Sequence, residues 1–347
     1  MKKISAEIVA DSVNPQGQRI TSFILTFPRF ILAELNTHRM FSRNSASSRA
    51  VPFKKMVESV KSDPFIPYAW QKDHAGMQGN EYLVGEEKAE AVMSWRVGAL
   101  GAAERAEDLN KYSVTKQLCN RVLEPFMWHT ALVTTTDLQN FIDLRSSTYE
   151  YKDAKFATRR DVIEAAAKDG ITIPADAPLE MWLQKNTGQA EIHLMLLVEE
   201  MLNARYDSKP KLLGYGGWHI PFGDKIDDEK LVDVLYKMNN EKFPINSSFV
   251  MQAKTEIATA RAARLSYINY EGKDDYEADL KLYHRLSKSG HWSPFEHVAR
   301  VMTQDEFKEY TKTVPMLNDK GVIIGCDVEH GWCRNFQGFI QLRAMLD

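Results

Sequence analysis

The sequence contains little cysteine and no long apolar run. Its three cysteines, Cys119, Cys326 and Cys333, are an odd number without a pairing pattern, so no disulfide framework is indicated. No stretch approaches the roughly 18 uncharged apolar residues that a membrane-spanning helix requires. The first residues contain Glu7 and Asp11 in place of the apolar core of a signal peptide. We therefore expect a reduced, cytoplasmic protein that contacts no membrane.

The sequence also lacks an excess of basic residues. It has 44 lysines and arginines against 47 aspartates and glutamates, for a formal net charge of -3. No basic field therefore favours binding to a nucleic-acid polymer. Neither G-x-G-x-x-G nor a P-loop pattern occurs, which argues against a Rossmann-type cofactor site. A small anionic molecule is still compatible with the charge, because it requires only a few local arginines.

The residues that are present are typical of a globular protein, with 44% hydrophobic and 26% charged side chains. Residues 6–13 and 20–27 are predicted strands, separated by the turn sequence Asn-Pro-Gln-Gly at 14–17. Composition and helical spacing of apolar residues predict helices over 29–36, 86–113, 115–132, 189–204 and 246–289. Residues 208–226 are rich in Gly and Pro and indicate a loop or domain junction. The predicted fold class is α+β, dominated by helix.

Residues 37–49 (T-H-R-M-F-S-R-N-S-A-S-S-R) form the densest polar segment, with three arginines, one histidine and several hydroxyls. Such a segment makes a poor buried helix. It suits an anion, because hydroxyls and backbone amides donate to phosphate oxygens and arginines add bidentate charge-assisted bonds. A solvated, serine-rich surface loop accounts for the same composition, so both interpretations stay open at this point.

The same segment resembles the signature R-H-R-x-x-S-x-N-E-x-S-x-R-Y of the flavin-dependent (alternative) thymidylate synthases. The matching residues, all in register, are His38, Arg39, Ser42, Asn44, Ser47 and Arg49. Thr37, Ser45 and Ala50 stand where the family has Arg, Glu and Tyr.

A second block lies over residues 121–145. Arg121-Val-Leu-Glu-Pro, followed by Asn140 and then Leu-Arg at 144–145, resembles the family's helix pair that ends in N-F-x-x-L-R. The resemblance implies that Arg121 helps to hold the nucleotide and that Arg145 contacts and activates the pyrimidine. Gln-Ala-Glu-Ile at 189–192 resembles the family's next motif, which makes residues 146–188 an insertion. Thr134 and Thr136 stand where the family has Asn and Arg.

A third block lies near the C-terminus. Residues 260–267 and 289–297 resemble two family elements that precede the arginine-rich signature in the family. The order of the matching elements is therefore rearranged, as in a circular permutation or in a duplication whose halves have each lost part of the site. It places Ser266, Ser293 and Glu296 in the flavin site, with His291 close to the flavin or folate. Arg334 lies nine residues before Arg343, which is the family spacing of a flavin-binding arginine.

A short internal echo bears on the duplication. N-F-I-D-L-R at 140–145 resembles G-F-I-Q-L-R at 338–343, which fits either a repeat or two unrelated amphipathic helices. If the echo is a repeat, the chain has an alternative thymidylate synthase-like fold with two family-like halves. Residues 1–216 would carry the nucleotide signature and the insertion, and residues 217–347 the flavin elements.

The resemblance implies an FAD-dependent enzyme that converts dUMP to dTMP with methylenetetrahydrofolate and NADPH, as a homo-oligomer with shared sites. It assigns activation of the pyrimidine to Arg145, and nucleotide binding to Ser47, Arg49, Arg121 and Arg145. It assigns FAD to His38, Arg39, Asn44, Asn140, Ser266, His291, Ser293, Glu296 and Arg334. The exchanges at Thr37 and Ser45 leave open a related C5 transfer, such as hydroxymethylation, and dCMP as substrate. A non-catalytic nucleotide- or flavin-binding relative is the third alternative.

Two other kinds of site are disfavoured. His291 and His297 are six residues apart with Pro294 between them, so they do not share one helix face as zinc-binding histidines do, and we expect no metal. Cys119 lies in a predicted helix without an activating motif, which favours a buried structural cysteine over a catalytic nucleophile.

Overall fold

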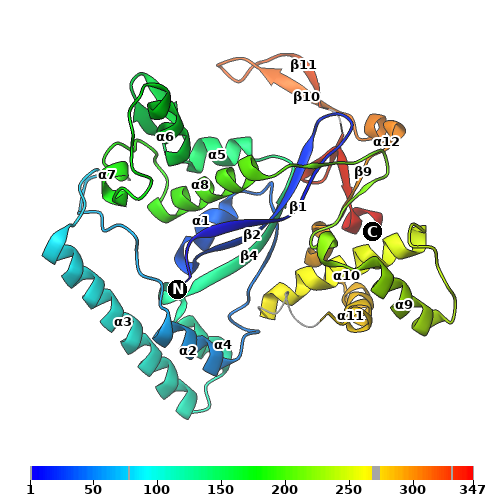
Figure 1. Cartoon of the computed structure of the whole chain (residues 1–347), viewed down its shortest axis with the longest axis horizontal. Helices are drawn as coiled ribbons and strands as arrows, with labels where there is room; N and C mark the ends of the chain where they lie inside the picture. The colour runs from blue at the N-terminus through cyan, green and yellow to red at the C-terminus, as the bar shows by residue number, and fades with distance from the viewer. Residues whose placement is uncertain (1, 77–78, 268–273, 330, 347) are drawn as a thin grey trace.

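The computed structural model describes residues 2–76, 79–267, 274–329 and 331–346. Its centre is a five-stranded sheet in the order β3-β4-β2-β1-β7 (Figure 1). These strands are β1 (Ser5–Val13), β2 (Arg19–Pro28), β3 (Ser42–Ser45), β4 (Trp128–Thr135) and β7 (Lys211–Leu212). The pairs among β1, β2, β4 and β3 are antiparallel, and β7 pairs with β1 in parallel.

The alternation of side chains along β2 explains why it lies at the centre of the sheet. Phe23, Leu25 and Phe27 face one hydrophobic cluster, which includes α8 (Ile192–Asp207). Ile24 faces the other side and packs against Ala262 at the end of α10 (Ser248–Arg264). Figure 1 shows α8 and α10 on opposite sides of the central strands. Both faces of the strand are thus buried, as expected where helices cover both sides of a sheet.

The other helices group around this sheet. α1 (Leu32–Thr37) and α5 (Gln139–Arg145) lie on the α8 side, and α9 (Asp228–Asn239) and α11 (Tyr276–Lys288) pack with α10. α2 (Phe53–Ser62), α3 (Gly85–Lys111) and α4 (Lys116–Arg121) form a separate cluster, and Figure 1 shows α3 as a long helix at the edge of the molecule. None of the helices in the described ranges is long and apolar enough to cross a membrane.

Shorter elements complete the chain. A three-stranded sheet, in the order β14-β9-β8, is made of β8 (Trp218–His219), β9 (Ala299–Val301) and β14 (Phe339–Gln341). The predicted insertion folds into β5 (Tyr149–Tyr151), β6 (Ala154–Phe156), α6 (Arg159–Lys168) and α7 (Leu179–Leu183). The remaining elements are α12 (Gln304–Glu309), the hairpin β10 (Lys312–Leu317) and β11 (Ile323–Glu329), and the pair β12 (Trp332–Cys333) and β13 (Phe336–Gln337).

Most of the predicted elements are confirmed. The strands over 6–13 and 20–27 are β1 and β2, and the helices over 86–113 and 189–204 are α3 and α8. The helical region over 246–289 contains α10 and α11, and its residues 268–273 lie outside the described residues. The helix over 115–132 is wrong in its second half. There the residues from Trp128 onward form β4, because they pair with β2 on one side and β3 on the other.

The internal echo is not a structural repeat. Residues 140–145 lie in α5, whereas residues 338–343 run through β14 into the 3-10 helix η6 (Leu342–Met345). The alternative of two amphipathic helices also fails for the second copy. The division into halves at residue 216 stays a prediction. Phe222 and Ala262, which follow that position, pack directly on Ile24 of the central sheet.

Candidate functional site

Segments from the two ends of the chain meet beside β3. The backbone amide of Ser47 donates to the carbonyl of Ser266 over 3.1 Å, and the buried Nδ2 of Asn44 donates to the carbonyl of Ala262, also over 3.1 Å. β3 packs against the 3-10 helices η4 (Leu265–Tyr267) and η5 (Ser293–Glu296). The polar segment 42–49 is thus held against the C-terminal end of α10 by buried and backbone hydrogen bonds.

A cavity of about 750 Å³ opens at this junction, and we name it the Ser47 cavity. Its lining includes four residues that the sequence singled out, namely Ser47, Arg49, Ser266 and His291. Two further arginines, Arg264 and Arg285, also line it, together with Asp275, Ser289 and several apolar side chains. This volume is within the usual range for small-molecule sites, and three guanidinium groups favour an anionic occupant.

Arg264 is fixed by a buried carboxylate. Its Nη2 lies 2.8 Å from Oδ1 of Asp279 on α11, and Asp279 is only 1% exposed. Nε of Arg261 lies 3.7 Å from the same carboxylate. Burial raises the pKa of Asp279 to about 6, although both arginines act to lower it. By contrast, Arg49 and Arg285 are exposed and form no ion pair within the described ranges, so their charges are available to a ligand.

On the other side of β3 the C-terminal segment contributes polar side chains. Ser42 Oγ accepts hydrogen bonds from Asn335 Nδ2 (3.1 Å) and from Gln341 Nε2 (2.9 Å). Glu296 in η5 forms an ion pair with Arg343. Burial lowers the pKa of Arg43 on β3, and the nearby charge of Glu296 opposes this effect. Glu296 is therefore engaged within the protein and does not line the Ser47 cavity.

His38 occupies a core position. Its ring centroid lies 4.4 Å from that of Phe41 and 5.2 Å from that of Phe141. Burial lowers the pKa of the imidazole, which favours the neutral form. Its Nε2 is buried without a hydrogen-bond partner in the described part of the chain. The neighbouring Arg39 is exposed.

The remaining predicted residues do not line the Ser47 cavity of the single chain. Arg145 Nη2 donates to Thr37 Oγ1 over 3.2 Å, and Asn140 is exposed on the same helix. Arg121 is exposed on α4, 4.0 Å from Glu124. Ser293 lies in η5, and Arg334 is exposed with a left-handed φ of 58°. A site completed by a second copy of the chain, as the resemblance implies, stays a prediction.

A buried chain of polar side chains crosses the central strands, and no sequence pattern predicted it. His219 Nδ1 and Nε2 lie 2.9 Å from the hydroxyls of Ser12 and Ser22, respectively. Ser22 Oγ lies 2.7 Å from Thr134 Oγ1, which lies 2.9 Å from His297 Nδ1. Burial lowers the pKa of each histidine to about 3, so both rings are neutral near pH 7. His297 is thus part of the interior, in contrast to the exposed His291.

A different catalytic chemistry would require an accessible cysteine nucleophile or a metal site. Cys119 is fully buried in α4, which confirms the structural position expected for it. Cys333 is also buried, and Cys326 is exposed on β11. Among the residues that the structure describes, no three His, Cys, Asp or Glu side chains are grouped to hold a metal ion.

Comparisons with known proteins give a limited likeness. No family model matches the chain, and no curated protein matches it. Among solved structures it is similar to the UMP/dUMP methylase PolB from Streptomyces cacaoi bound with 5-Br UMP, with a TM-score of 0.40 and 14% identity over 59% of this chain and 89% of that chain. The same enzyme bound with 5-Br dUMP gives a TM-score of 0.39 and 13% identity over 59% and 90%.

Proposed function

We propose that the chain is an FAD-dependent thymidylate synthase, which converts dUMP to dTMP with methylenetetrahydrofolate and NADPH. One observation carries the proposal. Ser47 and Arg49 from the arginine-rich segment, and Ser266 and His291 from the C-terminal blocks, line a single cavity. These residues are distant in the sequence, and the resemblance assigns them to the nucleotide and to the flavin of one site. A chance resemblance in scattered blocks gives no reason for them to meet.

The residues of the Ser47 cavity fit a flavin dinucleotide. Its pyrophosphate requires cationic donors, and Arg264 and Arg285 supply two guanidinium groups on the lining, beside the Arg49 that the resemblance assigns to the nucleotide. Hydroxyls of Ser47 and Ser266 add short polar side chains beside them. When bound, the flavin supplies the hydride chemistry. The role of the chain is to hold the nucleotide and the flavin in register, which removes much of the entropic barrier to reaction.

Activation of the pyrimidine is assigned to Arg145. Uracil C5 is a weak nucleophile unless negative charge can develop on the ring, and a guanidinium close to the ring stabilises that charge without a covalent cysteine adduct. The complete burial of Cys119 is consistent with a mechanism that uses no thiol. Because Arg145 and Arg121 lie outside the Ser47 cavity of one chain, the proposal includes a homo-oligomer in which a second copy supplies them.

The contact between Arg145 and Thr37 favours one variation of this function. Thr37 stands where the family has an arginine, and its hydroxyl accepts from the guanidinium of Arg145 over 3.2 Å. A changed partner for the activating arginine can alter the base that is accepted or the group that is transferred. Hydroxymethylation, and dCMP as substrate, are therefore kept as the second candidate.

The test combines a spectrum with a product mass. Purified protein should show a flavin absorbance spectrum, or acquire one with FAD. It should then convert dUMP or dCMP in the presence of methylenetetrahydrofolate and NADPH. The mass of the product, measured by mass spectrometry, distinguishes a transferred methyl group from a hydroxymethyl group. The mass of its base distinguishes a uracil product from a cytosine product. Protein that binds no flavin and forms no product with either nucleotide would contradict the proposal.

A further inference from the structure

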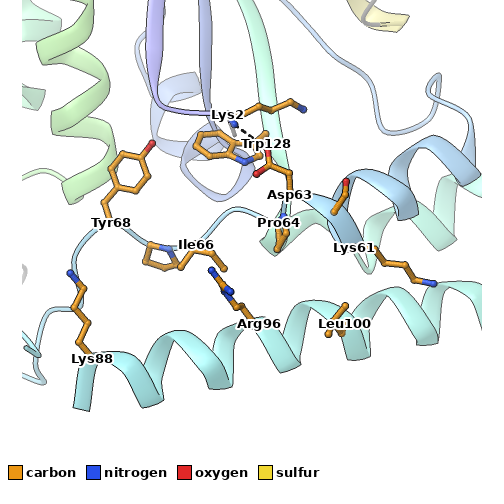
Figure 2. A pocket seen from close by; sticks show the side chains of 12 residues that line it. Lys2, Lys61, Asp63, Pro64, Ile66, Tyr68, Lys88, Arg96, Leu100 and Trp128 are labelled. Atoms are coloured by element: carbon orange, nitrogen blue, oxygen red, sulfur yellow. Dashed lines mark hydrogen bonds between the residues drawn. The ribbon is translucent and has the colours of Figure 1, made fainter. Parts of the chain in front are cut away.

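A second large cavity lies between α3 and the end of the central sheet, outside every residue that the resemblance assigns. It has a volume of about 560 Å³, and we name it the Trp128 cavity. Figure 2 shows Trp128 on one side of it and Arg96 and Leu100 of α3 on the other, with Tyr68 and Lys88 toward one end and Lys61 toward the other. The volume is typical of a small-molecule site.

Charge around the Trp128 cavity is predominantly positive. Lys2, Lys61, Lys88 and Arg96 line it, with Asp63 as the acidic residue. Lys61 pairs with Glu107 over 2.7 Å, and Lys88 pairs with Glu180. Arg96 and the side chain of Lys2 form no ion pair within the described ranges. Two cationic groups are therefore free to meet an anionic ligand, whereas the charges of the paired lysines are largely offset by their glutamates.

The walls of the same cavity are apolar and fixed in position. Pro64, Ile66, Pro67 and Leu100 line it together with Trp128. The Trp128 ring packs edge-on against Phe65, with centroids 5.1 Å apart and an interplanar angle of 88°. Tyr68 Oη accepts from the backbone amide of Ile4 over 3.0 Å. A rigid aromatic wall with a cationic rim suits a ligand that carries both a flat ring and anionic groups.

A small cavity of about 130 Å³ shares lining residues with both large cavities. It shares Lys2 and Trp128 with the Trp128 cavity, and Ser47 with the Ser47 cavity. Its own lining adds the cations Arg29 and Lys55 and the hydroxyls of Ser48 and Ser59. Cationic residues thus line all three cavities.

We propose that the Trp128 cavity binds the anionic, ring-bearing part of an elongated co-substrate whose reactive end lies in the Ser47 cavity. The inference rests on the proposed function, which requires two co-substrates of this chemistry. Reduced folates carry flat rings and glutamate carboxylates, and NADPH carries an adenine and phosphates. Both therefore belong to the class of ligand that suits this lining, with a flat ring and anionic groups. The arrangement gives Arg96 a binding role although it lies on a peripheral helix.

The experiment compares Arg96→Ala with Arg105→Ala, a matched control on the same helix whose exposed side chain does not line the cavity. Both substitutions are on the exposed surface, and neither removes a core contact. Affinities for NADPH, tetrahydrofolate and its pentaglutamate are measured by anaerobic calorimetry with the protein loaded with reduced FAD, so that NADPH binds without transferring hydride. In Arg96→Ala, loss of one charge-assisted hydrogen bond should weaken the binding of at least one of these ligands roughly tenfold. The affinities of Arg105→Ala should equal those of the wild type. FAD binding should be the same in all three proteins.

The outcomes separate the two proposals. A loss confined to NADPH assigns the cavity to the phosphates, and a loss confined to the folates, larger for the pentaglutamate, assigns it to the carboxylates; either result supports the inference. Unchanged affinities for all three ligands in a flavin-binding protein would overturn it and leave the proposed function standing. Failure to bind FAD, by contrast, would count against the proposed function itself. A change in sedimentation of Arg96→Glu without a change in any affinity would show a protein interface and would also overturn the inference.

Discussion

The backbone amide of Ser47 donates a 3.1 Å hydrogen bond to the carbonyl of Ser266, which joins the loop after β3 to η4. Because the bond uses only main-chain atoms, substitution of either side chain removes a hydroxyl from the cavity and leaves the joint intact. The adjacent bond from Asn44 Nδ2 to the carbonyl of Ala262 holds the same two segments together. Side chains of the Ser47 cavity can therefore be tested for binding without dismantling the site.

Arg49 gives the most direct test of the cavity. Its side chain is exposed and forms no ion pair within the described residues, so Arg49→Ala should change the free energy of unfolding by less than about 0.5 kcal/mol. Loss of a charge-assisted bond to phosphate should weaken dUMP binding by about tenfold, or by more if the bond is bidentate. Calorimetry with dUMP, with Arg105→Ala as the control, checks this expectation. An unchanged affinity would remove Arg49 from the nucleotide site.

The ion pair between Glu296 and Arg343 allows a binding role to be separated from a structural one. Glu296→Ala and Arg343→Ala each break the same pair, whose side chains are 22% and 31% exposed, and each should destabilise the fold by about 1 kcal/mol. If Glu296 contacts the flavin, its replacement should also weaken FAD binding, and replacement of Arg343 should weaken it less. Absorbance titration with FAD measures both. Equal losses would show that the pair acts only through the fold.

Local patterns in the sequence account for much of the fold. The turn at 14–17 works because Asn14 Oδ1 accepts from the amides of Gln16 and Gln18, and because Gly17 adopts a φ of 84°. The strand over 20–27 was predicted from its own residues and the adjoining turn, without any knowledge of its neighbours. β4 was missed, since its strand conformation depends on pairing with both β2 and β3, which are distant in the sequence.

The candidate site was predictable only in part, for the same reason. Ser47, Arg49, Ser266 and His291 stood out through the resemblance, and the structure places them together. Arg264 did not stand out, because its position depends on the buried Asp279 of another helix. Arg285 is one of several arginines on amphipathic helices, and only the packing of α11 against α10 brings it to the cavity.

The cysteines provide a test of the chemistry. Replacement of all three by alanine should leave turnover unchanged, since Cys119 is fully buried and the proposed mechanism forms no adduct with a thiol. Cys119→Ala should lower the free energy of unfolding by about 1 kcal/mol, because it leaves a small cavity. Turnover and chemical denaturation are measured on the same samples. Loss of turnover in folded Cys119→Ala protein would indicate a covalent mechanism and contradict the assignment to Arg145.

The buried chain from Ser12 to His297 predicts how stability depends on pH. Burial lowers the pKa of His219 to about 3, below the value of 6.5 expected in the unfolded chain. The folded state therefore disfavours the charged imidazole. The contribution of the neutral His219 ring to the free energy of unfolding is fully present above about pH 6.5 and is lost as the pH falls below that value. Between pH 7 and pH 5 the loss is about 2 kcal/mol for one such histidine. His297, whose pKa is also lowered to about 3, adds a loss of the same sign.

His219→Gln isolates this effect, since glutamine can bond to both hydroxyls but does not titrate. The free energy of unfolding, measured by urea denaturation, should fall between pH 7 and pH 5 by about 2 kcal/mol less in this variant than in the wild type. Asp279, whose raised pKa of about 6 acts in the opposite direction, is present in both proteins and cancels in the comparison. His284→Gln is the control, because that side chain is 62% exposed, and it should keep the wild-type dependence. If His219→Gln and the wild type show the same pH dependence, His219 is not buried as a neutral ring, and the chain of hydroxyls and imidazoles through the sheet is wrong.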